Sequence, residues 1–465
     1  MNTVKKQTTI IRHTWKILMP LVFFCFGCSD TTTPAITEEN DILAGGATTI
    51  NDATSKAFAT PAPNLGAESF ALHMEGDVAF DAKFVTAPAS VNSGIGPLYN
   101  NISCSNCHTN DGRGTPPRNG EELTSMLFRL SVPGTSPDGG PNPAPGFGGQ
   151  LQPRSIYGCS SEGNVRISYT EMPGAFPDGE TYSLRQPTYT IINHYTDLPA
   201  GLMLSPRVAP PVFGLGLLEA VPENVITAKA DESDADKDGI SGRPNYVFDV
   251  VNKRSAIGRF GLKCNMPNLH QQNAGAYNGD MGVTSSVFPD ENSLGQVQAI
   301  PAHTPEVDDK TLDAVVHYTR TLAVPARRNS NDETVKRGKQ LFLQANCAGC
   351  HTPTLTTGTM DKLPEVSNQT IHPYTDLLLH DLGDELSDGR PDFLATGNEW
   401  RTSPLWGIGL TELVNGHSNF LHDGRARNYV EAILWHGGEA TASRDYFKKL
   451  PKGDRDAVVA FLRSL

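Results

Sequence analysis

The sequence predicts a mainly α-helical protein built from two tandem domains of one type, the first enlarged by loop-rich insertions. Two observations support this fold class. The motif Cys-x-x-Cys-His occurs at residues 104–108 and again at 347–351. Two further segments follow each motif in the same order, a Pro-x-x-Gly-x-Gly-Leu-x-Glu stretch and an Asp-Ala-Val-Val stretch: 211–219 and 313–322, then 404–412 and 456–465. A repeated order of motifs indicates a duplicated structural unit.

Each Cys-x-x-Cys-His motif is typical of covalent attachment of a c-type haem. Two thiols three residues apart can each add to one vinyl group of a porphyrin, and the histidine that follows can coordinate the iron as the proximal ligand. Zinc would need a second compact set of ligands, and a thioredoxin-like dithiol does not require the histidine. We therefore expect two covalent haems, bound by Cys104, Cys107 and His108 and by Cys347, Cys350 and His351.

The end of the chain has the spacing of an amphipathic helix. Its apolar residues recur at i, i+3, i+4 and i+7, namely Val458, Phe461, Leu462 and Leu465. A second helix is expected just before the second motif, with one face made of Gly338, Leu341, Phe342 and Ala345. In a class I cytochrome c fold the last helix packs across the first, so we expect this crossing in the second domain.

The first domain is longer than the second. Glu219 lies 111 positions after His108, but Glu412 lies only 61 positions after His351. Likewise, Asp313 lies 94 positions after Glu219, but Asp456 lies only 44 positions after Glu412. Two insertions of roughly 50 residues each are therefore expected in surface loops. The expected domains are residues 65–325 and 333–465, joined by a linker.

The N-terminus carries an export signal. Basic residues precede a short apolar run that fits the h-region of a signal peptide and is too short to span a bilayer. Residues 1–28 are the expected lipoprotein signal, and Cys28 would be acylated; plain cleavage to a soluble product is the alternative. A flexible tether would follow at 29–64. The expected location is the periplasm of a Gram-negative bacterium, with membrane contact, at the outer membrane, through the lipid anchor only.

The net charge limits the class of binding partner, and the number of cysteines limits the possible disulfides. The net charge of −13 argues against nucleic acid as a partner. Of eight cysteines, only Cys159 and Cys264 lie outside the signal region and the haem motifs. In an oxidising compartment they are a candidate disulfide, and two separately buried thiols are the alternative.

Longer segments around these motifs resemble a known family. They include GPLYNNISCSNCH, MLSPRVAPPVFGLGLLEAVPE, QQNAGAYNGDMGVTSSVFP and FLHDGRARNYVEAILWHGGEA. Over roughly residues 65–465 the chain resembles bacterial di-haem oxidoreductases, peroxidase-like proteins also labelled thiol oxidoreductases and related to dihaem cytochrome c peroxidases. The resemblance implies a periplasmic dihaem protein in which one haem can be open for peroxide while the other relays electrons.

A calcium site is a further expectation. Asp234, Asp236 and Asp238 alternate before Gly239, as oxygen ligands do in a calcium loop, although the twelfth position is Asn245 rather than Glu. The related dihaem peroxidases hold calcium between their domains, which supports this assignment. An acidic surface turn is the alternative.

The distal sides of the haems are less constrained by the sequence. No histidine follows His108 before His194, so the first haem is expected to be the substrate site. Met203 is the candidate ligand if that haem is six-coordinate, and a core methionine is the alternative. His380 is the candidate distal ligand of the second haem, whereas His422 is expected to be structural.

Peroxide chemistry also needs a group that accepts and returns a proton. Glu219 is the first candidate and Glu223 the second, with a surface or ion-paired role as the alternative. Arg207, Arg401 and Arg425 are candidate partners of the haem propionates.

These features predict a periplasmic dihaem oxidoreductase of the peroxidase type, with electron transfer between the haems. The expected partners are an electron-donor protein, such as a small cytochrome or a cupredoxin, and a small-molecule or protein redox substrate. Two alternatives stay open: a pure electron carrier with both haems six-coordinate, and a redox accessory lipoprotein for iron uptake.

Overall fold

The computed structural model describes residues 1, 41–118, 121–293, 295–299 and 304–465. The predicted lipoprotein signal at 1–28 (Met1 apart), with Cys28, and the first part of the predicted tether lie outside the described residues. Residues 38–465 form one compact unit. Within the described ranges, no helix is both long enough and apolar enough to cross a bilayer.

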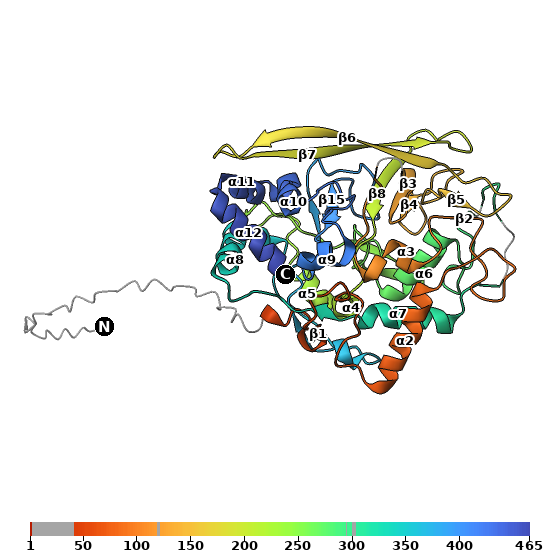
Figure 1. The fold of residues 1–465 in the computed structure, drawn as a ribbon, viewed down its shortest axis with the longest axis horizontal. Coiled ribbons are helices and arrows are strands. Elements are labelled where there is room, and N and C mark those ends of the chain that lie inside the picture. Colours follow the sequence, from red (N-terminus) through yellow and green to blue (C-terminus); the bar gives the residue numbers. More distant parts are fainter. Residues whose placement is uncertain (2–40, 119–120, 294, 300–303) are drawn as a thin grey trace, which may run out of the picture. The chain divides into compact units, whose positions relative to one another are not determined.

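The described part of the chain contains both helices and strands, with a run of strands from β3 to β8 between α3 and α4 (Figure 1). The α-helices are α2 (Ala67–Asp81), α3 (Cys104–Cys107), α4 (Leu215–Glu219), α5 (Glu223–Thr227), α6 (Leu269–Met281), α7 (Asp309–Thr321), α8 (Glu333–Gln344), α9 (Thr411–Asn415), α10 (Tyr429–Trp435), α11 (Thr441–Lys449) and α12 (Lys452–Ser464). The longer strands are β3 (Met126–Thr135), β6 (Asn164–Ala175), β7 (Thr181–Ile192), β8 (Met203–Val208), β9 (Tyr246–Asp249) and β10 (Arg254–Ile257). Short strands are β1 (Thr49–Ile50), β2 (Leu98–Tyr99), β4 (Pro141–Asn142), β5 (Arg154–Ser155), β11 (Val324–Pro325), β12 (Leu355–Thr356), β13 (Thr370–Ile371), β14 (Leu379–Asp381) and β15 (Glu399–Arg401).

The prediction of a mainly α-helical fold is wrong, because 29% of the chain is helical and 20% is in strands. The strands come largely from the first insertion, which was predicted to form surface loops. β3 pairs with β8 and β4, and β6 pairs with β7 along twelve residues. The signal for β6 was present in the sequence, because Val165, Ile167 and Tyr169 alternate with polar residues.

The predicted crossing of helices is present in both halves of the chain. A Cβ on Gly338 of α8 would lie 1.9 Å from the carbonyl oxygen of Ala457 on α12. A Cβ on Gly76 of α2 would lie 2.1 Å from the carbonyl oxygen of Ala314 on α7. Glycine therefore permits the same close backbone contact in each pair. The helix at 67–81 was not predicted from the sequence, although its Gly76 and Phe80 match Gly338 and Phe342 in spacing.

The repeated Gly-Leu-Glu segments have matching structures. Gly214 and Gly407 adopt φ values of +70° and +71°. Two residues later, a Cβ on Gly216 or on Gly409 would lie 2.1 Å from the carbonyl oxygen of Arg320 or of Arg463, respectively. Each segment therefore packs against the end of the last helix of its own half.

A third pair of equivalent segments is visible only in the backbone conformation and not in the sequence. Phe260 bridges to Met266, and Phe420 bridges to Ala426. The segments then end in an asparagine that caps the next helix: Asn268 accepts a hydrogen bond from the N–H of Gln271 before α6, and Asn428 accepts one from Glu431 before α10. The two segments share little sequence, so α6 and α10 are equivalent by structure.

The regions expected to be a tether and a linker are packed in the structure. In the described part of the tether, β1 pairs with β11, and Phe58 stacks on Phe213 with ring centroids 4.3 Å apart. Asp41 forms a buried ion pair with Arg327, which lies in the expected linker. Residues 41–64 are thus part of the folded body.

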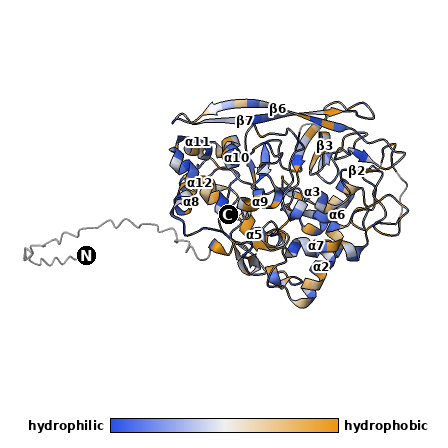
Figure 2. Ribbon diagram, in the orientation of Figure 1, coloured by the Kyte–Doolittle hydropathy of each residue, from blue (hydrophilic) through white to orange (hydrophobic). Residues whose placement is uncertain are grey.

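The β6–β7 hairpin lies along one side of the body, from α11 to β3 (Figure 1). Its apolar end contacts the first half, where the Tyr189 ring lies 5.3 Å from that of Phe128. Its turn contacts the second half, where Arg455 bonds Asp178 at 2.8 Å. The rest of the hairpin is largely hydrophilic (Figure 2). An insertion of the first half therefore fastens the two halves together.

Candidate haem sites

The four motif cysteines lie on short helical turns. Cys104 and Cys107 are on α3, which starts at Ser103, whose hydroxyl accepts a hydrogen bond from the N–H of Asn106. Cys347 begins the 3-10 helix η3 (Cys347–Gly349) and Cys350 follows it. All four are free thiols. Burial raises the pKa of each thiol, to about 12 for Cys107 and Cys347.

The two motif histidines are held in the same way. The Nδ1 of His108 donates to the carbonyl oxygen of Pro210 at 2.7 Å, and the Nδ1 of His351 donates to that of Tyr374 at 3.0 Å. Such bonds fix the ring and direct Nε2 toward a metal. Burial lowers the pKa of both rings, to about 4 for His351, and so keeps them in the neutral form that binds iron.

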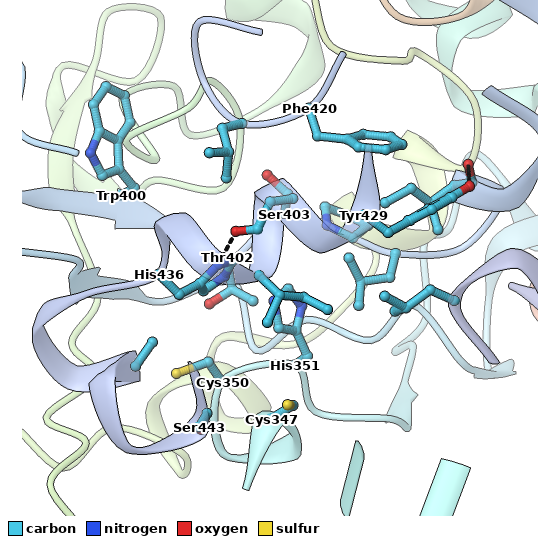
Figure 3. Close-up of a pocket in the computed structure, with 18 of the residues that line it drawn as sticks. Cys347, Cys350, His351, Trp400, Thr402, Ser403, Phe420, Tyr429, His436 and Ser443 are labelled. Atoms are coloured by element: carbon cyan, nitrogen blue, oxygen red, sulfur yellow. Dashed lines mark hydrogen bonds between the residues drawn. The ribbon is translucent and has the colours of Figure 1, made fainter. Parts of the chain in front are cut away.

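A cavity of about 270 Å³ opens beside the second motif. Its wall contains Cys347, Cys350 and His351 together with one face of α10, as Figure 3 shows. The rest of the wall is mostly apolar, from α8 and α12: Leu341, Phe342, Ala345, Val458 and Leu462. Two thiols, a fixed imidazole and an apolar slot together fit a haem attached at this motif.

Of the three arginines predicted to bind propionates, Arg401 is the one that lines the cavity. Arg207 pairs with Asp392 at 2.9 Å, and Arg425 pairs with Asp423 at 2.9 Å. The buried NH1 nitrogen of Arg401 has no hydrogen-bond partner among the residues that the structure describes. Arg401 therefore fits a carboxylate at the cavity edge.

His380 lines the cavity but is engaged on both ring nitrogens. Its Nε2 bonds Asp376 at 2.8 Å and its Nδ1 bonds Glu439 at 2.8 Å. Burial opposes the charged ring, but the bonds to these carboxylates raise the pKa of His380 to about 12. The structure thus leaves this predicted ligand no free nitrogen.

Met203, the candidate ligand of the first haem, lies on β8 opposite Ser131 and does not line the cavity beside the second motif.

The two glutamates predicted to move protons were expected at the first haem, and the cavity beside the second motif does not test this role. Glu219, only 8% exposed, forms an ion pair with Arg320 of α7 at 2.5 Å and accepts a hydrogen bond from the N–H of Leu269. It therefore connects α4, α6 and α7. Glu223 is an exposed residue at the start of α5. Neither carboxylate lines the cavity.

The acidic loop brings together a slightly different set of carboxylates from the one predicted. Oxygens of Asp231, Asp234 and Asp236 lie within 4.8 Å of one another. Asp238 instead accepts a hydrogen bond at 3.2 Å from the side chain of Asn346, directly before the second motif. The loop could therefore hold a cation beside that motif, with Asp231 as the ligand that the sequence had not indicated.

Cys159 and Cys264 do not form the predicted disulfide, because both are free thiols. Cys264 is fully buried, and its thiol donates to the carbonyl oxygen of Leu377 at 3.3 Å. Cys159 is only partly buried, in a turn after Gly158. The alternative of two separate thiols describes the structure better.

Two residues that the sequence did not single out lie at the motifs. His436 follows α10 and lines the cavity, and Figure 3 shows it with His351 in the same pocket. Tyr277 of α6 is 1% exposed, and its hydroxyl has no partner among the described residues. Burial, and to a lesser degree the thiol of Cys104, raises the pKa of Tyr277. The helical spacing of α10 could have indicated His436, whereas nothing local indicated Tyr277.

The two Gly-Leu-Glu segments also interlock between the halves. A Cβ on Gly214 would lie 2.6 Å from the ring of Trp406, and one on Gly407 would lie 2.5 Å from the ring of Phe213. Both rings line the cavity. The segment after each motif therefore provides an aromatic ring that packs on the glycine of the other.

The fold and the sites define a compact unit with two candidate haem sites that share a common plan. The chain belongs to the family described as di-haem oxidoreductase, putative peroxidase, whose model matches residues 40–465. No curated protein matches the chain. A structure of Kuenenia stuttgartiensis hydrazine synthase pressurized with 20 bar xenon is similar at 20% identity and a TM-score of 0.23, over 34% of this chain and 55% of that chain. The match thus covers about half of the length of that chain.

Proposed function

We propose that this protein is an exported oxidoreductase that reduces peroxide, with the first motif as the substrate site and the second as an electron relay. The observation that carries the proposal is the buried hydroxyl of Tyr277. Tyr277 belongs to the hydrophobic cluster against which Cys104 packs, and its hydroxyl has no partner among the described residues. A buried hydroxyl without a partner is unfavourable, so a bound oxygen ligand would complete its hydrogen bonding.

When bound through both thiols, each haem supplies a redox-active iron. His108 and His351 would hold that iron through Nε2, because their Nδ1 atoms donate to carbonyl groups. Tyr277 donates a hydrogen bond to the substrate oxygen at the first site. Phe213 and Trp406 fill the space between the segments that follow the two motifs and exclude water there.

Electron transfer between the sites is part of the proposal, and the fixed spacing of the motifs supports it. The N–H of Arg113 donates to the side chain of Asn415 at 3.0 Å, and Asn110 donates to the carbonyl oxygen of Val414 at 3.1 Å. The chain just after the first motif is thereby joined to the second half. Electrons would come from a small cytochrome or a cupredoxin.

The proposal also includes export, a lipid anchor at Cys28 in the outer membrane, and a calcium ion at Asp231, Asp234 and Asp236. The anchor is tested by replacing Cys28→Ala and following the protein in membrane and soluble fractions. Release of the variant from the membrane is expected, and retention would contradict the anchor.

The enzymatic proposal is tested on the holoprotein. The pyridine haemochrome assay should give two haems per chain, and half-reduced protein should react with hydrogen peroxide in a stopped-flow experiment. Tyr277→Phe should slow this reaction about 10²-fold, the usual effect of removing one such donor. Tyr246→Phe, at an exposed position, is the matched control. Two low-spin haems and no reaction with peroxide would instead show a pure electron carrier.

A further inference from the structure

The orientation of His436 resembles that of the two motif histidines. Its Nδ1 donates to the carbonyl oxygen of Ala432 at 2.7 Å. Its Nε2 has no hydrogen-bond partner among the described residues, and the ring lines the cavity beside His351 (Figure 3). A ring held by a carbonyl at Nδ1, with Nε2 free, is the arrangement of an imidazole that binds a metal.

Helix α10 explains why the ring points into the cavity. Residues at i, i+3, i+4 and i+7 share one face of a helix, and the cavity wall contains Tyr429, Ala432, Ile433 and His436. The opposite face buries Leu434 and Trp435 in the core. His436, which directly follows α10, thus continues the apolar face of this helix and is the one histidine on that face.

The chain directly after His436 is fixed by close packing. Gly438 has a φ of +52°, and a Cβ there would lie 2.2 Å from the carbonyl oxygen of Asp381. A Cβ on Gly437 would lie 2.8 Å from the carbonyl oxygen of Leu382. The backbone that carries His436 is therefore held against β14, which limits the positions that the ring can adopt.

Three other histidines of the second half, two of which line the cavity, have different surroundings. His380 bonds a carboxylate at each nitrogen. His422 stacks on Trp400 with ring centroids 3.9 Å apart, and its Nε2 lies 3.7 Å from a carboxylate oxygen of Asp423. His417 bonds the backbone of Arg113 with one nitrogen and that of Asn419 with the other. Among the described histidines of the cavity wall, His422 also has an Nε2 without a hydrogen-bond partner, but its ring lies stacked on Trp400 and beside Asp423. His436 lies in the same pocket as His351, and no described carboxylate bonds its ring.

The first half has no equivalent ligand. α6 and α10 both begin after a capping asparagine, Asn268 and Asn428. Counting from these caps, the position of His436 corresponds to Ala276. The methyl group of alanine cannot bind iron, so the two sites differ at the same structural position.

We propose that the Nε2 of His436 is the sixth ligand of the haem at Cys347 and Cys350, opposite His351, and that Ala276 leaves the first haem without a ligand from α6. This rests on the proposed function in so far as a haem must be attached at each motif. Two imidazole ligands give a low-spin iron suited to electron relay, whereas a missing ligand leaves a position for substrate.

The test is the electron paramagnetic resonance spectrum of the oxidised holoprotein, with the haem content measured in every variant. The wild type should give one low-spin signal of the two-imidazole type, about half of the total haem, and one high-spin signal. His436→Ala should convert the low-spin signal into a high-spin one, and added imidazole should restore it. His436→Met should keep a low-spin iron and raise its reduction potential, because methionine ligation favours the reduced form.

His380→Ala and His422→Ala are the control variants and should keep the low-spin signal. Its loss in either control, or its persistence in His436→Ala at full haem content, overturns the assignment. If His436→Ala does not retain two haems, the shift in potential of His436→Met decides the question, and an unchanged potential overturns the proposal. Peroxide reactivity is measured separately, so a wild type inert to peroxide but with this ligand refutes only the enzymatic proposal.

Discussion

Gly338 provides a sharp test of the crossing between α8 and α12. A Cβ added by Gly338→Ala would lie 1.9 Å from the carbonyl oxygen of Ala457 and 2.8 Å from the Cβ of Phe461. Carbon and carbonyl oxygen approach no closer than about 3.3 Å, so the helices would have to separate by more than about 1 Å. Phe461 is fully buried at this crossing.

The expected loss of stability follows from two opposing effects. Overpacking of this kind costs about 1–3 kcal/mol and occasionally more, whereas replacing a helical glycine by alanine contributes about 0.5–1 kcal/mol. Because the contacting atom belongs to the backbone, little relaxation is available, and we expect a net fall of about 2 kcal/mol in the free energy of unfolding. Urea unfolding of the holoprotein, followed by circular dichroism, measures it.

The matched control is Gly279→Ala in α6, where the nearest atoms to a Cβ are 3.8 and 3.9 Å away. This variant should be as stable as the wild type or slightly more stable. Gly76→Ala, whose Cβ would lie 2.1 Å from the oxygen of Ala314, should behave like Gly338→Ala. Equal stability of Gly338→Ala and Gly279→Ala would refute the close crossing.

Three further predictions concern other parts of the molecule. Glu219→Gln, which removes the charge partner of Arg320, should lower the free energy of unfolding by about 1–3 kcal/mol; a variant of wild-type stability in urea unfolding would contradict the anchoring role of Glu219. Burial raises the pKa of Glu162 from 4.5 to about 8. The folded state therefore holds a proton that the unfolded state releases, and the stability contributed by this group is present below the unfolded pKa and is lost as pH rises through about 8. Glu162→Gln should remove that decline in unfolding experiments across this pH range, and an equal decline in the variant would refute the assignment. Chelation of calcium should lower the melting temperature of the wild type but not that of Asp234→Asn, as differential scanning calorimetry can measure; equal responses would exclude the site at Asp231, Asp234 and Asp236.

The crossing helices and the motif histidines were accessible from the sequence, because they depend on spacings within a few residues. Gly338, Leu341 and Phe342 lie on one turn of helix, and the helix forms as predicted. The hairpin lies in an insertion that was predicted to form surface loops, although Val165 and Ile167 carried the alternation of a strand. The equivalence of α6 and α10 could not be predicted, since the two segments share backbone conformation and hardly any side chains.

The sequence by itself indicated the family and the two Cys-x-x-Cys-His motifs, because each motif is encoded by neighbouring residues. The tertiary structure decided which other groups can act at those sites. His380 and His436 cannot be distinguished by residue type in the sequence. In the structure, the carboxylates of Asp376 and Glu439 bond both nitrogens of His380. The ring of His436 bonds only a carbonyl group of the preceding helix, α10. Glu219 is likewise committed to Arg320, 101 residues further along the chain. The availability of a side chain depends on partners that only folding brings within hydrogen-bond distance.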